Sequence, residues 1–155
     1  MAITYLPPED HVLRHVGYQR LRRDEDDNVV GCLPDAFQRR ETEDALSVTW
    51  VEHFDGDRSE KLSLAIAATR KELDVRPKSG FALANVGRIQ EICEFSGHKV
   101  RIIHEPTELN TAHSEIRRLP RDEIDLLELL ASDAVIEVLL AAQFPPAAVD
   151  ETTIA

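Results

Sequence analysis

The alternation of apolar and polar side chains predicts strands in the first third of the chain. His11–Tyr18 alternates weakly, and Val29–Leu33 is a short apolar run that is followed by Pro34. The acidic run 24–28 between these two segments has the composition of a turn, so we expect a hairpin. Ala45–Phe54, which is rich in β-branched and aromatic residues, is the strongest strand candidate.

Helical spacing begins after a break at residues 55–57. Asp57 and Glu60 stand three residues apart, which is the spacing of a capping box at the start of a helix. Apolar residues then recur with helical spacing as far as Leu73. The pattern therefore predicts a helix from about Arg58 to Leu73.

A strand, a helix and a second strand follow in close succession. The apolar run Phe81–Ala84 predicts the first strand, and the β-branched run Lys99–Ile103 predicts the second. Asn85 is a suitable cap for a helix over residues 86–95, which Gly97 would end. This order is compatible with a βαβ crossover and also with an antiparallel arrangement of the two strands.

The longest apolar pattern in the chain lies between Ile124 and Leu140. From Asp122 to the C-terminus there are eight acidic and no Lys or Arg residues, in a chain whose net charge is −11. Pro120 and the acids after it suit the first turn of a helix, where negative charge meets the positive end of the dipole. We therefore expect a long acidic C-terminal helix that ends near residue 142.

The apolar arc of this expected helix is wider than the single stripe that a helix on one surface needs. Exposing several Leu side chains is unfavourable, so the pattern predicts burial against the core and also against a protein partner or a second copy. The expected binding residues are Leu126, Leu130 and Leu139. The acidic edge of this helix favours a basic partner. The Arg residues of the first 40 positions support an equally good alternative, in which the N-terminal and C-terminal parts of the chain pack against each other.

Length and composition favour one folded domain. A chain of 155 residues with 43% apolar residues can bury a substantial core. We expect an N-terminal arm at residues 1–10, a single domain at 11–142 and a C-terminal tail at 143–155. The expected fold class is α+β or α/β, with a mixed sheet and about three helices that include the acidic one.

Charge and cysteine content indicate which partners and which cellular compartment suit the protein. The acidic balance disfavours binding to nucleic acids and to anionic membranes, because both rely on Lys and Arg. Cys32 and Cys93 lie far apart among apolar neighbours, which is typical of buried free thiols. No signal peptide or membrane-spanning segment is evident, and these features together favour the cytoplasm.

Residue types suited to chemistry gather in an expected polar connection at residues 104–119. It holds His104 with Glu105 and His113 with Glu115, and a His can act as acid or base near neutral pH. The spacing matches no zinc signature, so we expect no metal ion. The alternative is that these are ordinary polar residues of a loop.

A second group combines Arg14 and His15 of the first strand with Ser47 of the strand that begins at Ala45. An arginine on one strand that faces hydroxyl groups on others can hold phosphates and ribose hydroxyls. Alternatively, Arg14 forms an ion pair on the sheet face and Ser47 is an ordinary strand residue. The glycines are scattered and form no phosphate-binding loop, so no cofactor is expected.

The order of several short segments resembles that of a loose class of small uncharacterised bacterial proteins. The segments are an Arg-bearing first strand at Arg14, Ala36-Phe37, Leu46-Ser47-Val48, and Ala112-His113 followed by Ile116. The resemblance covers about residues 11–116, leaves the acidic C-terminal region outside and implies no activity. It favours Arg14, Ser47 and His113 as site residues.

These patterns support three functional hypotheses. The leading one is a non-catalytic binding protein whose acidic helix docks on a partner or a second copy, with His104 and Glu105 as further binding residues. The first alternative is a small enzyme that modifies nucleotides or nucleic acids, with Arg14, Ser47 and His113 as catalytic residues. The second is an acidic inhibitor that mimics nucleic acid. Convergence of the three catalytic candidates in one cleft would favour the enzyme, and the sequence indicates no particular small-molecule ligand.

Overall fold

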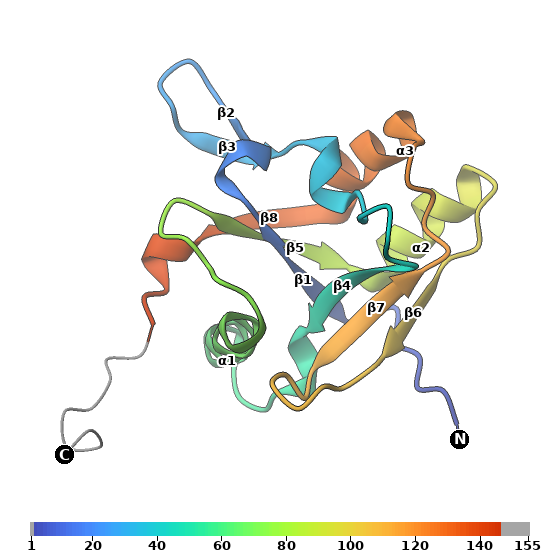
Figure 1. Cartoon of the computed structure of the whole chain (residues 1–155), viewed down its shortest axis with the longest axis horizontal. Coiled ribbons are helices and arrows are strands. Elements are labelled where there is room, and N and C mark those ends of the chain that lie inside the picture. Colours follow the sequence, from blue (N-terminus) through green and yellow to red (C-terminus); the bar gives the residue numbers. More distant parts are fainter. Residues whose placement is uncertain (1, 147–155) are drawn as a thin grey trace.

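A six-stranded sheet is the centre of this α+β fold, which the computed structural model describes for residues 2–146 (Figure 1). The strand order is β6-β7-β4-β1-β5-β8, and every neighbouring pair is antiparallel, so the expectation of a mixed sheet is wrong. The strands of this sheet are β1 (His11–Val16), β4 (Ala45–Trp50), β5 (Gly80–Asn85), β6 (Arg101–His104), β7 (His113–Arg117) and β8 (Val135–Leu140). A separate hairpin consists of β2 (Leu21–Arg23) and β3 (Val29–Cys32).

Helices cover both faces of the sheet. α1 (Arg58–Glu72) packs on one face, and α2 (Val86–Phe95) and α3 (Ile124–Leu129) pack on the other (Figure 1). Strand β1 reflects this division, because Val12 is buried toward α2 and α3 while Leu13 is buried toward α1. Short 3-10 helices lie at Tyr18–Arg20, Pro34–Phe37, Val51–His53 and Ala141–Gln143. None of the helices within residues 2–146 has the length and apolar character needed to cross a membrane.

Local sequence signals set the ends of two helices, as expected. The Glu60 N–H donates to Asp57 Oδ1 at 2.8 Å and the Asp57 N–H donates to Glu60 Oε1 at 3.3 Å, which completes the capping box of α1. The Arg88 N–H donates to Asn85 Oδ1 at 2.8 Å at the start of α2. Gly97 follows the end of α2 with a φ of +86°, a left-handed conformation that glycine adopts without strain.

The strand–helix–strand segment forms a long crossover. Because each neighbouring pair in the sheet is antiparallel, the strand order makes β5 and β6 run parallel to each other with β1, β4 and β7 between them. Helix α2 therefore carries the chain from one half of the sheet to the opposite edge. Of the two alternatives that the sequence left open for these strands, the structure has the crossover between parallel strands, although β5 and β6 are not neighbours in the sheet.

The N-terminal arm covers the outer edge of β6. The Leu6 N–H donates to Ile102 O at 3.0 Å, and the His104 N–H donates to Thr4 O at 2.9 Å. Leu6 is also buried in the core between the sheet and α2. The arm expected at residues 1–10 is thus packed on the domain where it is described, and the tail beyond residue 146 lies outside the described residues.

The predicted hairpin forms, but with a different first strand. Its strands are β2 and β3, and the acidic run 24–28 is the turn between them. Strand β1, which we expected to be the first arm, is a central strand with β4 on one side and β5 on the other. A hairpin partner at β1 would have to displace one of these two strands.

The long acidic C-terminal helix is not formed, and this prediction is wrong. α3 continues as a π-helical segment, Leu130–Ala134, after which the chain enters strand β8. Strand β8 has three β-branched residues. It pairs with β5 so that Leu140 stands opposite Gly80 at one end and Val135 stands opposite Ala84 at the other. An apolar run of this length fits a helix or a strand, and the available edge of β5 decides between them.

Basic side chains from other parts of the chain pair with much of the acidic C-terminal region. The pairs are Glu123 with His98, Glu128 with Arg22, Asp133 with Arg88 and Glu137 with Arg58. Exposed pairs of this kind each stabilise a fold only slightly. One of the four pairs, Arg22–Glu128, joins the first 40 residues to the acidic region, as the sequence allowed, and the other three use basic residues from the middle of the chain.

Both cysteines are buried and form no disulfide, as expected. Burial raises the pKa of the Cys32 thiol to about 11 and that of the Cys93 thiol to about 12. The reactive form of cysteine is the thiolate, so a raised pKa together with burial makes both side chains chemically inert. They contribute to packing in the core between the sheet, α2 and α3.

Substitution of Gly80 by alanine tests the pairing of β5 with β8. A methyl group at this position would lie 2.8 Å from Leu139 O, whereas one at Gly17 would meet no atom within 4 Å. We expect Gly80→Ala to lower the free energy of unfolding by about 1–3 kcal/mol and Gly17→Ala to change it by less than about 0.5 kcal/mol, as measured by urea denaturation. Equal effects of the two substitutions would contradict the paired strand.

Candidate functional site

The centre of the sheet is split where β1 and β4 diverge. These two strands pair only at Val12–Trp50 and Leu13–Thr49, although β1 pairs with β5 over six residues and β4 pairs with β7 over five. Beyond Leu13 the two strands separate, and the backbone of β4 loses its ladder partner on that side. On that side the Ser47 carbonyl accepts a hydrogen bond from a side chain instead.

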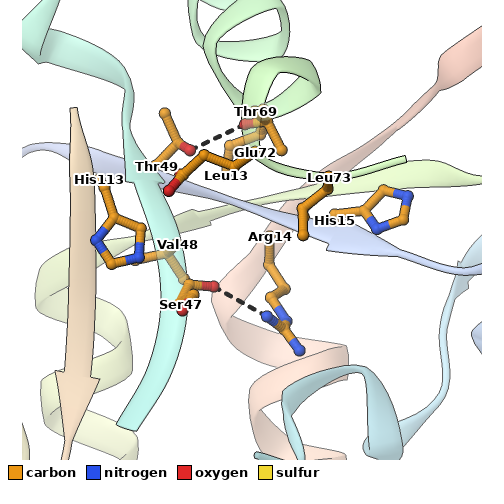
Figure 2. A pocket seen from close by; sticks show the side chains of 10 residues that line it. All are labelled: Leu13, Arg14, His15, Ser47, Val48, Thr49, Thr69, Glu72, Leu73 and His113. Carbon is orange, nitrogen blue, oxygen red and sulfur yellow. Dashed lines mark hydrogen bonds between the residues drawn. The ribbon is translucent and has the colours of Figure 1, made fainter. Parts of the chain in front are cut away.

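Arg14 supplies this donor. Its Nη1 donates to Ser47 O at 3.0 Å and its Nε donates to Ala36 O at 3.0 Å, so the guanidinium bridges the gap between the strands (Figure 2). The sequence-based alternative of an ion pair on the sheet face does not apply, because Arg14 has no acidic partner within ion-pair distance in residues 2–146. Arg14, which the sequence analysis selected as a candidate phosphate ligand, thus also donates hydrogen bonds to two backbone carbonyl groups.

A pocket of about 150 Å³ lies at this divergence, on the side of the sheet that α1 covers. Residues from β1, β4, β7 and the end of α1 line it (Figure 2). They are Leu13, Arg14, His15, Ser47, Val48, Thr49, Thr69, Glu72, Leu73 and His113, and we call this site the β1–β4 pocket. The three catalytic candidates from the sequence, Arg14, Ser47 and His113, therefore line one cavity.

Arg14 and Glu72 are the side chains of opposite charge that line the β1–β4 pocket. Burial lowers the pKa of the Arg14 guanidinium to about 10, and the charge of Arg20 acts in the same direction while that of Glu43 opposes it, so the group is still charged at neutral pH. Its Nη2 makes no hydrogen bond to any side chain or carbonyl in the described part of the chain. A half-buried guanidinium with a free nitrogen can pair with an anion.

His113 presents one free nitrogen. It lies in strand β7 and not in the loop that the sequence predicted, and its Nδ1–H donates to Glu105 O at 2.8 Å. Because a carbonyl oxygen can only accept, this bond leaves Nε2 as the proton acceptor of the neutral ring. Ser47 stands opposite Glu115, and His113 stands opposite Thr49, so Ser47 and His113 are diagonal neighbours on one face of the sheet.

No hydrogen bond joins the Ser47 hydroxyl to His113 in the described chain, so the geometry does not form a nucleophile–base pair. The Ser47 side chain is exposed, and its hydroxyl has no partner among residues 2–146. It is available as a donor to a ligand. The arrangement can therefore bind an anion with Arg14 and Ser47 and exchange a proton at His113.

A chain of buried hydrogen bonds forms the wall beside His113. Asn110 Nδ2 donates to Thr49 Oγ1 at 3.0 Å, and the Thr49 and Thr69 hydroxyls lie 2.9 Å apart. The Thr69 hydroxyl donates to Ala65 O, so Thr49 must be the donor of the pair. This network fixes α1 on β4 and gives the β1–β4 pocket a rigid polar wall.

His15, which the sequence grouped with Arg14 and Ser47, also lines the β1–β4 pocket. The Ser79 hydroxyl donates to Arg76 O at 2.7 Å, so His15 Nε2–H donates to Ser79 Oγ at 3.1 Å. Burial, with the charges of Arg14 and Arg70 in support, lowers the pKa of His15. The pocket residues that the sequence analysis missed include Thr49, Thr69 and Glu72, because no local pattern relates them to Arg14.

The other candidate residues lie away from this pocket. His104 Nε2–H donates to Thr111 O at 2.7 Å and its ring lies 5.2 Å from Trp50, while Glu105 pairs with Arg117 at 3.3 Å. These contacts fix the connection between β6 and β7. The candidate docking residues Leu126, Leu130 and Leu139 have exposed fractions of 2%, 0% and 5%, so the core of the chain itself surrounds them.

No three His, Cys, Asp or Glu side chains in the described range gather closely enough to hold a metal ion. Comparison of the chain with protein-family models, with curated proteins and with solved structures gives no match.

The lowered pKa of His15 makes stability depend on pH. Between its folded pKa and the ordinary histidine value of about 6.5, the unfolded chain binds more protons than the folded one, so the free energy of unfolding falls as the pH falls through this window. Burial and His104 also lower the pKa of His53, which acts in the same direction. We expect His15→Gln and His53→Gln each to flatten the decrease in urea stability from pH 7.5 to pH 5, and the double variant to flatten it further. An unchanged slope in the double variant would be inconsistent with this account.

Proposed function

We propose that this protein is a small enzyme that binds an anionic substrate in the β1–β4 pocket. The observation that carries the proposal is that Arg14, Ser47 and His113, from three different strands, line one cavity. The sequence singled out the same three residues without information on their positions in space. The interaction role loses its main support, because the long docking helix ends at Ala134 and its expected contact residues are buried.

Each of the three residues has a distinct role in this proposal. The free Nη2 of Arg14 binds the anion, and its charge offsets the charge of the substrate. The Ser47 hydroxyl donates a further hydrogen bond. His113 Nε2 accepts a proton from the bound substrate or returns one to it, while the bond from Nδ1 to Glu105 O holds the ring in position.

The volume of the β1–β4 pocket limits the size of the bound group. A cavity of about 150 Å³ has the space of about five water molecules. It accommodates one phosphate or carboxylate group with a few neighbouring atoms. The proposed substrate is therefore a small phosphorylated or carboxylated molecule. A nucleotide could place only its phosphate group in the pocket.

Ser47→Ala tests anion binding without disturbing the fold, because the hydroxyl makes no hydrogen bond within residues 2–146. We expect inorganic phosphate to shift the amide resonances of Arg14, Ser47 and His113, and Ser47→Ala to weaken binding by about two- to tenfold at an unchanged melting temperature. Ser63→Ala, on the exposed face of α1, is the matched control and should bind like the wild type. Shifts confined to other residues, or equal affinities of all three proteins, would refute the proposal.

Arg14→Lys tests the double role of the guanidinium. Lysine keeps the charge but cannot bridge two carbonyl groups, so we expect the free energy of unfolding to fall by about 1–3 kcal/mol. We also expect phosphate to raise the melting temperature of the wild type and to have little effect on the variant. Arg76→Lys, at an exposed side chain, should respond like the wild type. Equal stabilisation of Arg14→Lys by phosphate would exclude Arg14 as the anion ligand.

A further inference from the structure

A second pocket lies between the start of α1 and strand β8, on the same face of the sheet. Its volume is about 160 Å³, and it shares no residue with the β1–β4 pocket. The lining residues are His11, Val51, Glu52, Arg58, Lys61, Leu62, Leu83 and Ile136, and we call this site the α1–β8 pocket. Nothing in the proposed function uses it.

One wall of the α1–β8 pocket is a fixed histidine–carboxylate pair. His11 Nδ1–H donates to Glu52 Oε2 at 2.7 Å, and the backbone N–H of His11 donates to Glu52 Oε1 at 2.6 Å. Both carboxylate oxygens are therefore occupied, and the ring orientation is set. The Nε2 of His11 has no hydrogen-bond partner in the described residues, so it remains available to a ligand.

Lys61 is the charged group of this lining that has no ion-pair partner among the described residues. Arg58 pairs with Glu137, and Glu52 is hydrogen-bonded to His11, which offsets the Glu52 charge only in the protonated form. The Lys61 side chain is half-buried at the pocket. A ligand carboxylate complements this unpaired ammonium group.

The other walls are apolar. Val51, Leu62 and Leu83 are buried, with exposed fractions of 3–4%, and form the floor. Ile136 of β8 stands at the side with 57% of its surface exposed. An exposed isoleucine beside a cavity offers apolar area that a ligand can cover, and covering it is favourable.

We propose that the α1–β8 pocket binds a small apolar monocarboxylate. The carboxylate contacts Lys61, and the hydrocarbon part packs on Leu62, Leu83 and Ile136. The volume corresponds to about five water molecules, which suits a chain of a few carbon atoms. Neither Arg14 nor His113 takes part, so this proposal stands independently of the anion site in the β1–β4 pocket.

The test compares three probes by calorimetric titration: hexanoate, acetate, which lacks most of the chain, and 1-hexanol, which lacks the charge. We expect hexanoate to bind most tightly. Lys61→Met should weaken hexanoate binding about tenfold, because a hydrogen bond to a charged group is lost while the aliphatic stem is kept. Lys71→Met removes the same charge from the exposed side of α1, outside the pocket, and should leave the affinity unchanged.

Ile136→Thr probes the apolar wall. It keeps a β-branched side chain on the edge strand, so the melting temperature should change little, and it should weaken the binding of hexanoate more than that of acetate. The proposal is wrong if hexanoate does not bind, if 1-hexanol binds as tightly as hexanoate, or if Lys61→Met and Lys71→Met have equal affinities.

Discussion

The hydrogen bond from Arg14 to Ser47 O joins the two halves of the sheet where their ladder ends. Strands β6, β7 and β4 form one half and β1, β5 and β8 form the other, with two residue pairs joining them. A second bond, to Ala36 O, ties the same guanidinium to the 3-10 helix at Pro34–Phe37, so the fold holds a partly desolvated positive charge without a carboxylate partner at its centre. For an anion bound there as proposed, affinity and stability are coupled through this one side chain, because a ligand that binds only the folded state stabilises it.

The parts of the fold that could be predicted are those that depend on neighbouring residues. The capping box of Asp57 and Glu60, the cap at Asn85 and the left-handed Gly97 each act within one helical turn, and the structure has all of them. Arg14 and Ser47 were also selected for their residue types in two recognisable strands. Their meeting in one pocket could not be predicted, because it depends on the register between β1 and β4.

The errors arose where tertiary contacts choose between local alternatives. Val135–Leu140 is as apolar as a buried helix, and only the open edge of β5 makes it a strand. Strand β7 was missed because it is short and mostly polar, with Ser114 and Ile116 as its buried positions. Thr49, Thr69 and Glu72 come to the β1–β4 pocket from β4 and α1, and no local pattern marks them as site residues.

The central position of β1 has a consequence for the order in which the chain can fold. Leu13 pairs with Thr49, and His11 pairs with Asn85, so both ladder partners of β1 lie later in the sequence. Contacts between such distant residues carry a large loop-closure entropy, and sheets built from them fold slowly. Until β4 and β5 have been synthesised, β1 is a strand without ladder partners, and unpaired strand edges of this kind are prone to aggregation.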